Sequence, residues 1–405
     1  MRYTLGELAE IIDGDRGKNY PQQNDFFDSG YCLFLNTGNV TNHGFSFEQN
    51  QFITKEKCDI LRKGKLQRGD IVYTTRGTVG NAAYYSETVE YEHIRINSGM
   101  VIIRPNNDIV DTRFLYQILK SDYYRPFFKQ FCTGSAQPQL PIKNFSKIEL
   151  DIPALAIQTR IADILSAYDD LIVYNQKQIK LLEEAAQRLY KEWFVDLRFP
   201  GYENTPIIDG VPQGWNVRKL ETFGEIITGK TPSTAKESYY NGDIPFVKIP
   251  DMHSTIYPII TESKLSEEGA NTQKNKFIPK DSLMVSCIAT VGLVNIAVQE
   301  CQTNQQINSI ILNDVRDLYY LYFSTKGLKM LLAGVGSNGA TMTNVNKRKF
   351  ANVEILYPTI ELCEQFYDFC KPIFENILIL SKSTIELKNS RDQLLPKLMS
   401  GELEV

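Results

Sequence analysis

Apolar residues recur at alternating steps of four and three from Ile157 to Trp193. This spacing is the period of a helix that lays one apolar seam along a partner helix. At about 1.5 Å per residue the helix would be about 55 Å long, longer than an ordinary globular domain needs. The seam positions are Ile161, Leu165, Tyr168, Ile172, Ile179, Leu182, Leu189 and Trp193. The pattern therefore predicts a long helix whose partner lies elsewhere in the chain.

The C-terminal stretch repeats this rhythm. Adding 205 to a residue number superposes Ile157 on Leu362, Ile172 on Ile377 and Trp193 on Leu398. The seam positions of this second helix include Phe366, Ile373, Ile377, Leu387, Leu394 and Leu398. A register shared over so many apolar positions indicates an internal repeat. The alternative is two unrelated amphipathic helices, each buried in its own domain. Polar seam residues, Asn175 and Arg391, cost stability but can define the register of pairing.

The globular parts on either side of the first helix also match one another. Leu5, Ile11 and Ile12 correspond to Leu220, Ile226 and Ile227 at a difference of 215. The segment 281–292 (DSLMVSCIATVG) corresponds to 70–80 (DIVYTTRGTVG) with one residue inserted. A Pro- and Gly-rich connector follows Phe199 and separates the two copies. We therefore expect an α+β protein with an internal repeat, in which each of two mixed globular domains is followed by a long helix with coiled-coil spacing. Their expected bounds are 1–150, 151–198 (first long helix), 199–356 and 357–405 (second long helix).

Composition limits the class of protein. A chain of 405 residues suggests two or more domains, and 42% hydrophobic with 23% charged residues is typical of a soluble protein. The formal net charge of −4 gives no bulk attraction to nucleic acid, so any DNA-binding surface must be local. Seven scattered cysteines without C-x-x-C spacing favour a reducing compartment over a zinc site or disulfide framework. The N-terminus is no signal peptide and no apolar run could span a bilayer, so we expect a cytoplasmic protein without a membrane partner.

One segment fits a catalytic motif literally. Gly224–Thr231 has the spacing G-x-x-x-x-G-K-T of a phosphate-binding loop. That mechanism needs a buried strand before the loop and an apolar helix after it, and neither is predicted here. No histidine, acidic or nucleophile cluster has the spacing of a catalytic or metal site. We expect no enzymatic activity, no metal site and no cofactor in this chain.

Several local motifs carry a resemblance to a known family. They are Ile161–Leu165 through Asp169, Leu182–Glu183, Ala186–Gln187 and Trp193–Phe194 in the first helix, and Arg391–Glu402 (RDQLLPKLMSGE) in the second. The globular parts add Gly69–Asp70, the turn Arg76–Gly80 and the Gly134–Ser135 loop. With these motifs the chain resembles the specificity subunit of type I restriction-modification systems over essentially its whole length.

The resemblance implies two target-recognition domains, each reading one half of a split double-stranded DNA sequence. Two long antiparallel coiled-coil helices, related by the internal pseudo-twofold repeat, would separate the two domains and act as a rigid ruler. A stiff spacer of about 55 Å suits readers about one turn of B-DNA apart or somewhat more. The subunit would assemble two methyltransferase subunits and, through the complex, an ATP-dependent restriction/translocase subunit. S-adenosylmethionine, ATP and Mg²⁺ would then belong to the partner subunits.

Base edges and phosphates are read by Arg, Lys, Asn, Gln, Ser and Thr side chains in exposed loops. In the first domain the predicted DNA contacts are Arg76, Thr78, Asn81, Arg95, Asn97, Ser135, Gln137, Gln139 and Lys143. In the second they are Lys230, Lys248, Thr290, Gln305, Gln306, Asn308, Asn338, Thr341, Asn344, Asn346, Lys347 and Arg348. Two other classes remain open: a coiled-coil adaptor that binds only protein, and a nucleotide-binding enzyme that uses Gly224–Thr231.

Overall fold

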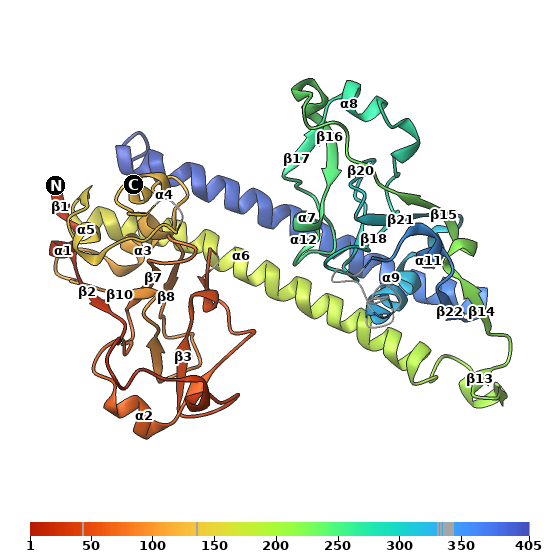
Figure 1. Cartoon of the computed structure of the whole chain (residues 1–405), viewed down its shortest axis with the longest axis horizontal. Helices are drawn as coiled ribbons and strands as arrows, with labels where there is room; N and C mark the ends of the chain where they lie inside the picture. Colours follow the sequence, from red (N-terminus) through yellow and green to blue (C-terminus); the bar gives the residue numbers. More distant parts are fainter. Residues whose placement is uncertain (43, 135–136, 330–331, 333, 335–343, 405) are drawn as a thin grey trace. The chain divides into compact units, whose positions relative to one another are not determined.

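The computed structural model describes residues 1–42, 44–134, 137–329, 332, 334 and 344–404. The chain divides into two compact units, one of residues 1–173 with 385–405 and one of residues 174–384 (Figure 1). Each unit contains one globular part and a stretch of both long helices. The segments 151–198 and 357–405, predicted as separate spacer helices, are therefore each shared between two units.

Unit 1 is built on a four-stranded antiparallel sheet in the order β2-β10-β7-β8. A second sheet, β6-β3-β9, and two short pairs, β1-β11 and β4-β5, complete its strands. The elements are β1 (Arg2–Thr4), α1 (Leu5–Leu8), β2 (Ala9–Asp13), β3 (Cys32–Leu35), β4 (Val40–Thr41), β5 (Gly44–Phe45), β6 (Phe52–Ile53), α2 (Lys55–Ile60), β7 (Ile71–Thr74), β8 (Ala82–Tyr84), β9 (Ile94–Ile96), β10 (Met100–Pro105), α3 (Thr112–Lys120), α4 (Arg125–Lys129), α5 (Ile142–Phe145) and β11 (Glu149–Asp151). The central strand β10 is a nearly continuous apolar run because sheet faces on both sides of it are covered.

Unit 2 repeats this topology. Its four-stranded sheet has the order β15-β21-β18-β19, and its three-stranded sheet β17-β16-β20 matches β6-β3-β9 in having one antiparallel and one parallel pair. The elements are β12 (Ile207–Ile208), β13 (Val211–Pro212), β14 (Asn216–Lys219), β15 (Gly224–Thr228), β16 (Tyr240–Val247), α7 (Ile249–Met252), β17 (Ser263–Leu265), α8 (Glu267–Asn271), β18 (Leu283–Ser286), β19 (Val294–Ile296), β20 (Gln302–Thr303), β21 (Ile307–Leu312), α9 (Leu318–Gly327), α11 (Lys347–Ala351) and β22 (Glu354–Tyr357). The internal repeat is therefore a repeat of topology as well as of apolar spacing.

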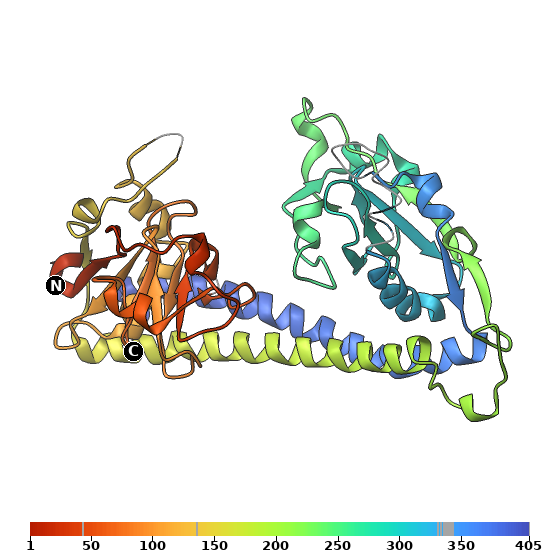
Figure 2. The same ribbon diagram turned by 60° about the horizontal axis from the view of Figure 1, so that its bottom comes forward.

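The long helices are α6 (Leu155–Tyr190), extended by a π-helical turn (Lys191–Val195), and α12 (Ile360–Ser400). Figure 2 shows each as a continuous ribbon. The two helices are antiparallel, because their contacts run in opposite directions along the sequence. Asp169 contacts Arg391 in unit 1, and in unit 2 Asn175 contacts Ser383 while Phe194 contacts Phe366. None of the predicted seam residues is exposed. The prediction missed Phe374 and Leu395, which are also buried there.

One detail of the predicted repeat is wrong, the insertion between 70–80 and 281–292. Gly69 and Asp281 hold the same backbone position, since each donates its N–H to the carbonyl of the neighbouring strand's end and each has a positive φ, 92° and 63°. Residues 69–80 therefore match 281–292 with no insertion, and Ser282, not Asp281, takes the place of Asp70.

The corrected match explains why the Gly-Asp motif is present in unit 1 only. Asp70 is 1% exposed and accepts two hydrogen bonds, both 2.9 Å, from the Arg104 guanidinium. In unit 2 Ser282 is equally buried and carries no charge to pair. The Gly-Asp motif is therefore a structural ion pair with a tight turn and is not part of a binding site.

Candidate nucleic-acid interface

In each unit the ends of three strands and one later loop meet at one edge of the four-stranded sheet. In unit 1 the register pairs Asp13, the last residue of β2, with Val101, and Thr74, the last of β7, with Met100. The backbone of Leu140 then donates to the Thr75 carbonyl at 3.0 Å and adds the later loop. We call residues 13–16, 75–81, 97–99 and 137–143, where described, the strand-end surface of unit 1.

Unit 2 forms the equivalent strand-end surface from residues 228–231, 287–292, 304–306 and 344–348. The same backbone contacts hold it together: Val345 N–H donates to the Cys287 carbonyl at 2.8 Å, and Cys287 N–H to the Gln306 carbonyl at 2.8 Å. Asn97 and Asn304 even form the same local turn, because each side-chain oxygen accepts the N–H two residues later. One backbone scaffold thus presents two sets of side chains.

The surface of unit 1 contains a cavity of about 280 Å³ that polar side chains line together with Leu140, Pro141 and Ile142. Arg76 and Gln139 line it together with Arg16, which donates to Asp13 at 3.1 Å and to the Ser98 carbonyl at 3.3 Å. Arg76 forms no ion pair with any acid in the described part of the chain. Its guanidinium can therefore donate to an added acceptor, as Arg does in bidentate readout of guanine or in phosphate contacts.

The surface of unit 2 carries different groups at the same places. Ile288 occupies the position of Arg76, and Lys230, Gln305, Asn344, Lys347 and Arg348 are exposed. Gln305 accepts a hydrogen bond of 2.6 Å from Thr231, the counterpart of the Arg16–Ser98 contact. The two surfaces therefore share a backbone and differ in the chemistry of their side chains.

Three predicted DNA contacts lie inside the fold and are corrected. Arg95 is 5% exposed and donates to the carbonyls of Leu61 and Lys63 and to the Cys58 sulfur. Asn81 donates to the Val40 carbonyl, and Asn308 donates to the Val345 carbonyl. Because their polar groups are used by the protein itself, these side chains are not available to bases.

Other predicted contacts hold loops in shape. The Asn346 side chain caps α11 by accepting from Lys349 N–H at 2.9 Å, and Gln306 accepts from the Asn304 side chain. Lys248 is half-buried and pairs with Glu262 at 2.9 Å, away from the strand-end surface. We assign Asn346, Gln306 and Asn97 to positioning of the surface, place Lys248 outside it, and retain the others as candidates.

The remaining predicted residues divide into three groups. Thr78, Gln137, Gln139, Lys143, Lys230, Gln305, Asn344, Lys347 and Arg348 are exposed, and Arg76 and Thr290 are half-buried. Ser135, Asn338 and Thr341 lie outside the described residues. Sequence reasoning missed Arg16 and Thr231, and the signal that could have found them is their shared place two residues after the matched Gly14 and Gly229.

The phosphate-loop motif has a structural explanation. Gly224–Thr228 forms the extended strand β15, so its amides pair with β21 and cannot surround a phosphate. A Cβ on Gly224 would lie 1.9 Å from the Ile311 carbonyl oxygen, and one on Gly229 would lie 2.2 Å from that of Asn304. Both glycines are needed for close approach of backbones, which leaves Lys230 as an exposed surface cation.

No cluster of His, Cys, Asp or Glu with the arrangement of a metal site occurs among the described residues. Over the same residues, no helix is long and apolar enough to cross a membrane.

Comparisons with known proteins agree with this arrangement. A family profile described as "Type I restriction modification DNA specificity domain" matches residues 1–184 and 212–389. The type I restriction enzyme HindI specificity subunit of Haemophilus influenzae is 32% identical, over 98% of this chain and 100% of that protein. The MjaIX specificity subunit of Methanocaldococcus jannaschii is 28% identical, over 84% of this chain and 78% of that protein. The solved S subunit of the type I restriction-modification system from M. genitalium has the same fold, with a TM-score of 0.59 and 13% identity over 98% of this chain and 96% of that one.

Proposed function

Because the chain belongs to the specificity subunits of type I restriction-modification systems, we propose that its two strand-end surfaces each read one half of a split double-stranded DNA sequence. The observation that supports this most directly is the duplicated surface with divergent side chains, such as Arg76 against Ile288. Arg suits bidentate contact with guanine, whereas an apolar side chain suits the thymine methyl group. Two readers on one scaffold would therefore read two different half-sites.

The long helices would keep the unread gap between the half-sites constant. Both α6 and α12 pass without a break through the residues where one unit gives way to the other, 173–174 and 384–385. A helix of 36 residues such as α6 is about 54 Å long at about 1.5 Å per residue. At the seam in unit 2, Asn175 is 8% exposed and donates to Ser383, so a polar contact there helps to define the pairing register.

The outer faces of the same helices would hold two methyltransferase subunits. Large apolar side chains stay exposed at positions that the repeat relates by 205 residues: Ile164 with Phe369, and Tyr174 with Ile379. Their exposed fractions are 38% and 48%, and 59% and 64%. Repeated apolar positions suit two copies of one partner. The chemistry, with S-adenosylmethionine, ATP and Mg²⁺, would belong to the methyltransferase and restriction/translocase subunits.

The test is to express the chain with the methyltransferase subunit of its own system and map adenine methylation by single-molecule sequencing. We expect a split motif with a gap of constant length. A stable complex that methylates no such motif would contradict DNA reading and favour the coiled-coil adaptor.

Exchange of the first globular part should change one half of the motif only. Residues 1–150 would be replaced by the matching part of a relative that has a different target. Since the reading side chains of unit 2 are untouched, the second half and the gap should be retained. The reciprocal exchange of residues 212–356 is the matched control and should change the other half. A change in both halves after one exchange would contradict independent reading.

Replacement of the exposed apolar side chains of the long helices by glutamate should reduce the number of methyltransferase subunits bound per chain. Ile164→Glu and Phe369→Glu each place a charge at one of two repeated positions, so each should weaken binding of one partner copy by roughly tenfold or more. Native mass spectrometry should then show one methyltransferase per chain instead of two. Lys382→Glu, at an exposed position of α12, is the control. If the double variant Ile164→Glu/Phe369→Glu still binds two methyltransferase copies, the partner binds at another surface of the chain.

A further inference from the structure

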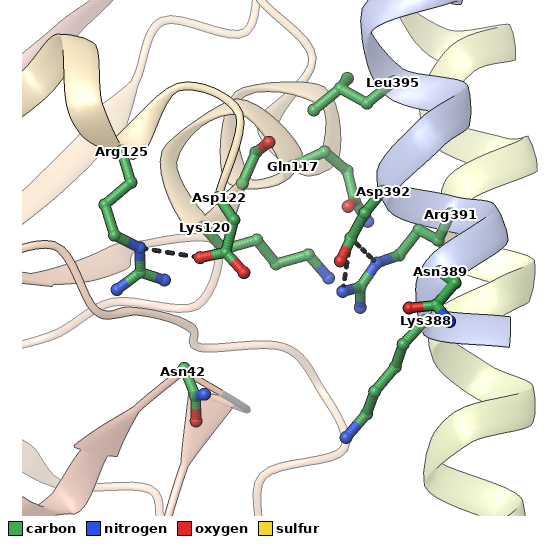
Figure 3. Close-up of a pocket in the computed structure, with 11 residues that line it drawn as sticks. Asn42, Gln117, Lys120, Asp122, Arg125, Lys388, Asn389, Arg391, Asp392 and Leu395 are labelled. Carbon is green, nitrogen blue, oxygen red and sulfur yellow. Dashed lines mark hydrogen bonds and ion pairs between the residues drawn. The ribbon is translucent and has the colours of Figure 1, made fainter. Parts of the chain in front are cut away.

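A cavity of about 230 Å³ lies in unit 1, where α12 passes the segment that joins α3 to α4 (Figure 3). Four cationic side chains line it: Lys120 and Arg125 from the globular part, and Lys388 and Arg391 from α12. Figure 3 shows the Lys120 ammonium and the Arg391 guanidinium pointing toward one another. The cavity thus joins two elements that are far apart in the sequence.

Carboxylates neutralise all but one of these cations. Arg125 pairs with Asp122 at 2.9 Å, and Arg391 pairs with Asp392 at 2.8 Å. Asp169 forms ion pairs with both Lys120, at 2.5 Å, and Arg391, at 2.7 Å. Lys388 has no carboxylate within ion-pair distance in the described part of the chain. Four cations facing three carboxylates leave one uncompensated positive charge.

Burial first, and the neighbouring Arg391 second, disfavour the protonated forms of the two lysines in this cavity. Burial and the neighbouring Arg391 hold the pKa of Lys388 below its ordinary value. Burial, opposed by Asp169, lowers the pKa of Lys120 to about 8. The Lys120 side chain is only 10% exposed, so the surrounding residues fix its position, unlike that of a surface lysine. An anion in the cavity would relieve this excess of positive charge.

The cavity adjoins the strand-end surface. Arg125 donates to the Asn81 side chain at 3.4 Å, and a Cβ on Gly80 would lie 3.5 Å from Arg125 Cγ. Both residues belong to the turn 75–81, which carries Arg76 and Thr78. Since half or more of protein–DNA hydrogen bonds go to phosphate and sugar, a cationic cavity beside a reading turn suits a backbone contact.

We propose that this cavity holds one phosphodiester of the DNA backbone that flanks the half-site read by unit 1. The single negative charge of a phosphodiester matches the single uncompensated charge of Lys388. The inference rests on the proposed function and adds a site to it, because α12 then contacts DNA directly. DNA bound to unit 1 would clamp the C-terminal end of α12 against the recognition domain.

The experiment measures binding of the assembled methyltransferase complex to a duplex that carries its mapped motif, by fluorescence anisotropy at several salt concentrations. Lys388→Gln should weaken binding by about tenfold, as loss of a charged hydrogen bond does. It should also reduce the slope of log K against log salt by about one, the signature of one lost phosphate contact. The loss should be equal for unrelated duplexes. Lys388→Arg should retain binding.

Lys397→Gln is the matched control, because Lys397 lies on the same helix in unit 1, carries the same charge and does not line the cavity. One contrary outcome is that the wild-type complex binds its motif while Lys388→Gln gives the same slope of log K against log salt as Lys397→Gln. In that case the cavity holds no DNA phosphate, although the proposed function stands. Failure of wild type to bind any split motif would instead contradict the proposed function. Thermal stabilisation of the chain by ATP or inorganic phosphate that Lys388→Gln abolishes, without loss of DNA affinity, would overturn the DNA assignment in favour of a free phosphate ligand.

Discussion

Replacement of Phe366 by alanine should lower the free energy of unfolding of unit 2 by about 3–5 kcal/mol. Phe366 is fully buried where α12 meets α6 and α9. Its ring centroid lies 5.0 Å from that of Phe194 in an edge-to-face contact, and 6.0 Å from that of Trp193. Truncation removes a large apolar side chain and leaves a cavity that aromatic neighbours cannot fill by small shifts. The helix pairing in unit 2 therefore depends strongly on this one residue.

Tryptophan emission during denaturant unfolding measures this effect selectively. The only two tryptophans of the sequence, Trp193 and Trp215, both belong to unit 2. The midpoint of the emission change should fall clearly for Phe366→Ala. Phe369→Ala, one helical turn away and 48% exposed, is the control and should change the midpoint little. Equal midpoints for the two variants would show that the aromatic cluster does not stabilise the helix pair.

Replacement of Asp169 by asparagine should destabilise unit 1 by roughly 2–3 kcal/mol, less than for a fully buried ion pair because the side chain is 22% exposed. Asp169 accepts hydrogen bonds from Lys120, from Gln117 at 2.6 Å and from Arg391 at 2.7 Å. Although burial opposes it, these partners hold the pKa of Asp169 below its ordinary value. Asparagine would leave two half-buried cations without a carboxylate between them. The C-terminal part of α12 should therefore loosen from α3.

The Asp169→Asn effect should depend on pH in a defined direction. Its stabilising contribution is fully present above the unfolded pKa of about 3.9 and is lost as pH falls through the lower folded pKa. The difference between variant and wild type should also shrink above pH 8, because Lys120, whose pKa is about 8, then loses its proton and its ion pair. Hydrogen exchange in α3 and in residues 385–400 at pH 7 and pH 9 measures the second effect, and thermal unfolding between about pH 3 and pH 6 measures the first. Asp170→Asn, exposed on the same helix, is the control; a pH-independent difference would contradict the ion-pair account.

Both units join the long helices to the globular part through buried apolar side chains and an ion pair, Asp169–Lys120 in unit 1 and Glu183–Lys326 in unit 2, but the main contacts differ. In unit 1 an ion network around Asp169 joins α12 to α3, whereas in unit 2 the aromatic side chains of Tyr190, Phe323 and Phe366 join the helices to α9. The shared apolar spacing of the two helices does not reveal this difference. It arises from which side chains of α3 and α9 face the seam.

Features with a short-range cause were predictable from the sequence. Helical periodicity predicted both long helices because seam residues three and four apart share one face of a helix whatever surrounds it. The matches at 205 residues in the helices and at 215 residues in the globular parts predicted the duplicated topology for the same reason, since apolar spacing carries the strand and helix pattern of each copy. The alignment of 281–292 with 70–80 was wrong because Asp281 was matched to Asp70 by residue type. In the structure Asp281 occupies the backbone position of Gly69.

Only the tertiary structure decided which polar loop residues face outward. Arg76 and Arg95 are both arginines beside predicted strands. Arg76 lines an open cavity, whereas Arg95 donates hydrogen bonds to carbonyls more than 30 residues away in the sequence. A polar side chain in a loop can donate to solvent, to a ligand or to the backbone, and its choice depends on distant segments that fold against it. The apolar periodicity of this chain therefore determined its helices and its repeat, and long-range packing alone determined its surface chemistry.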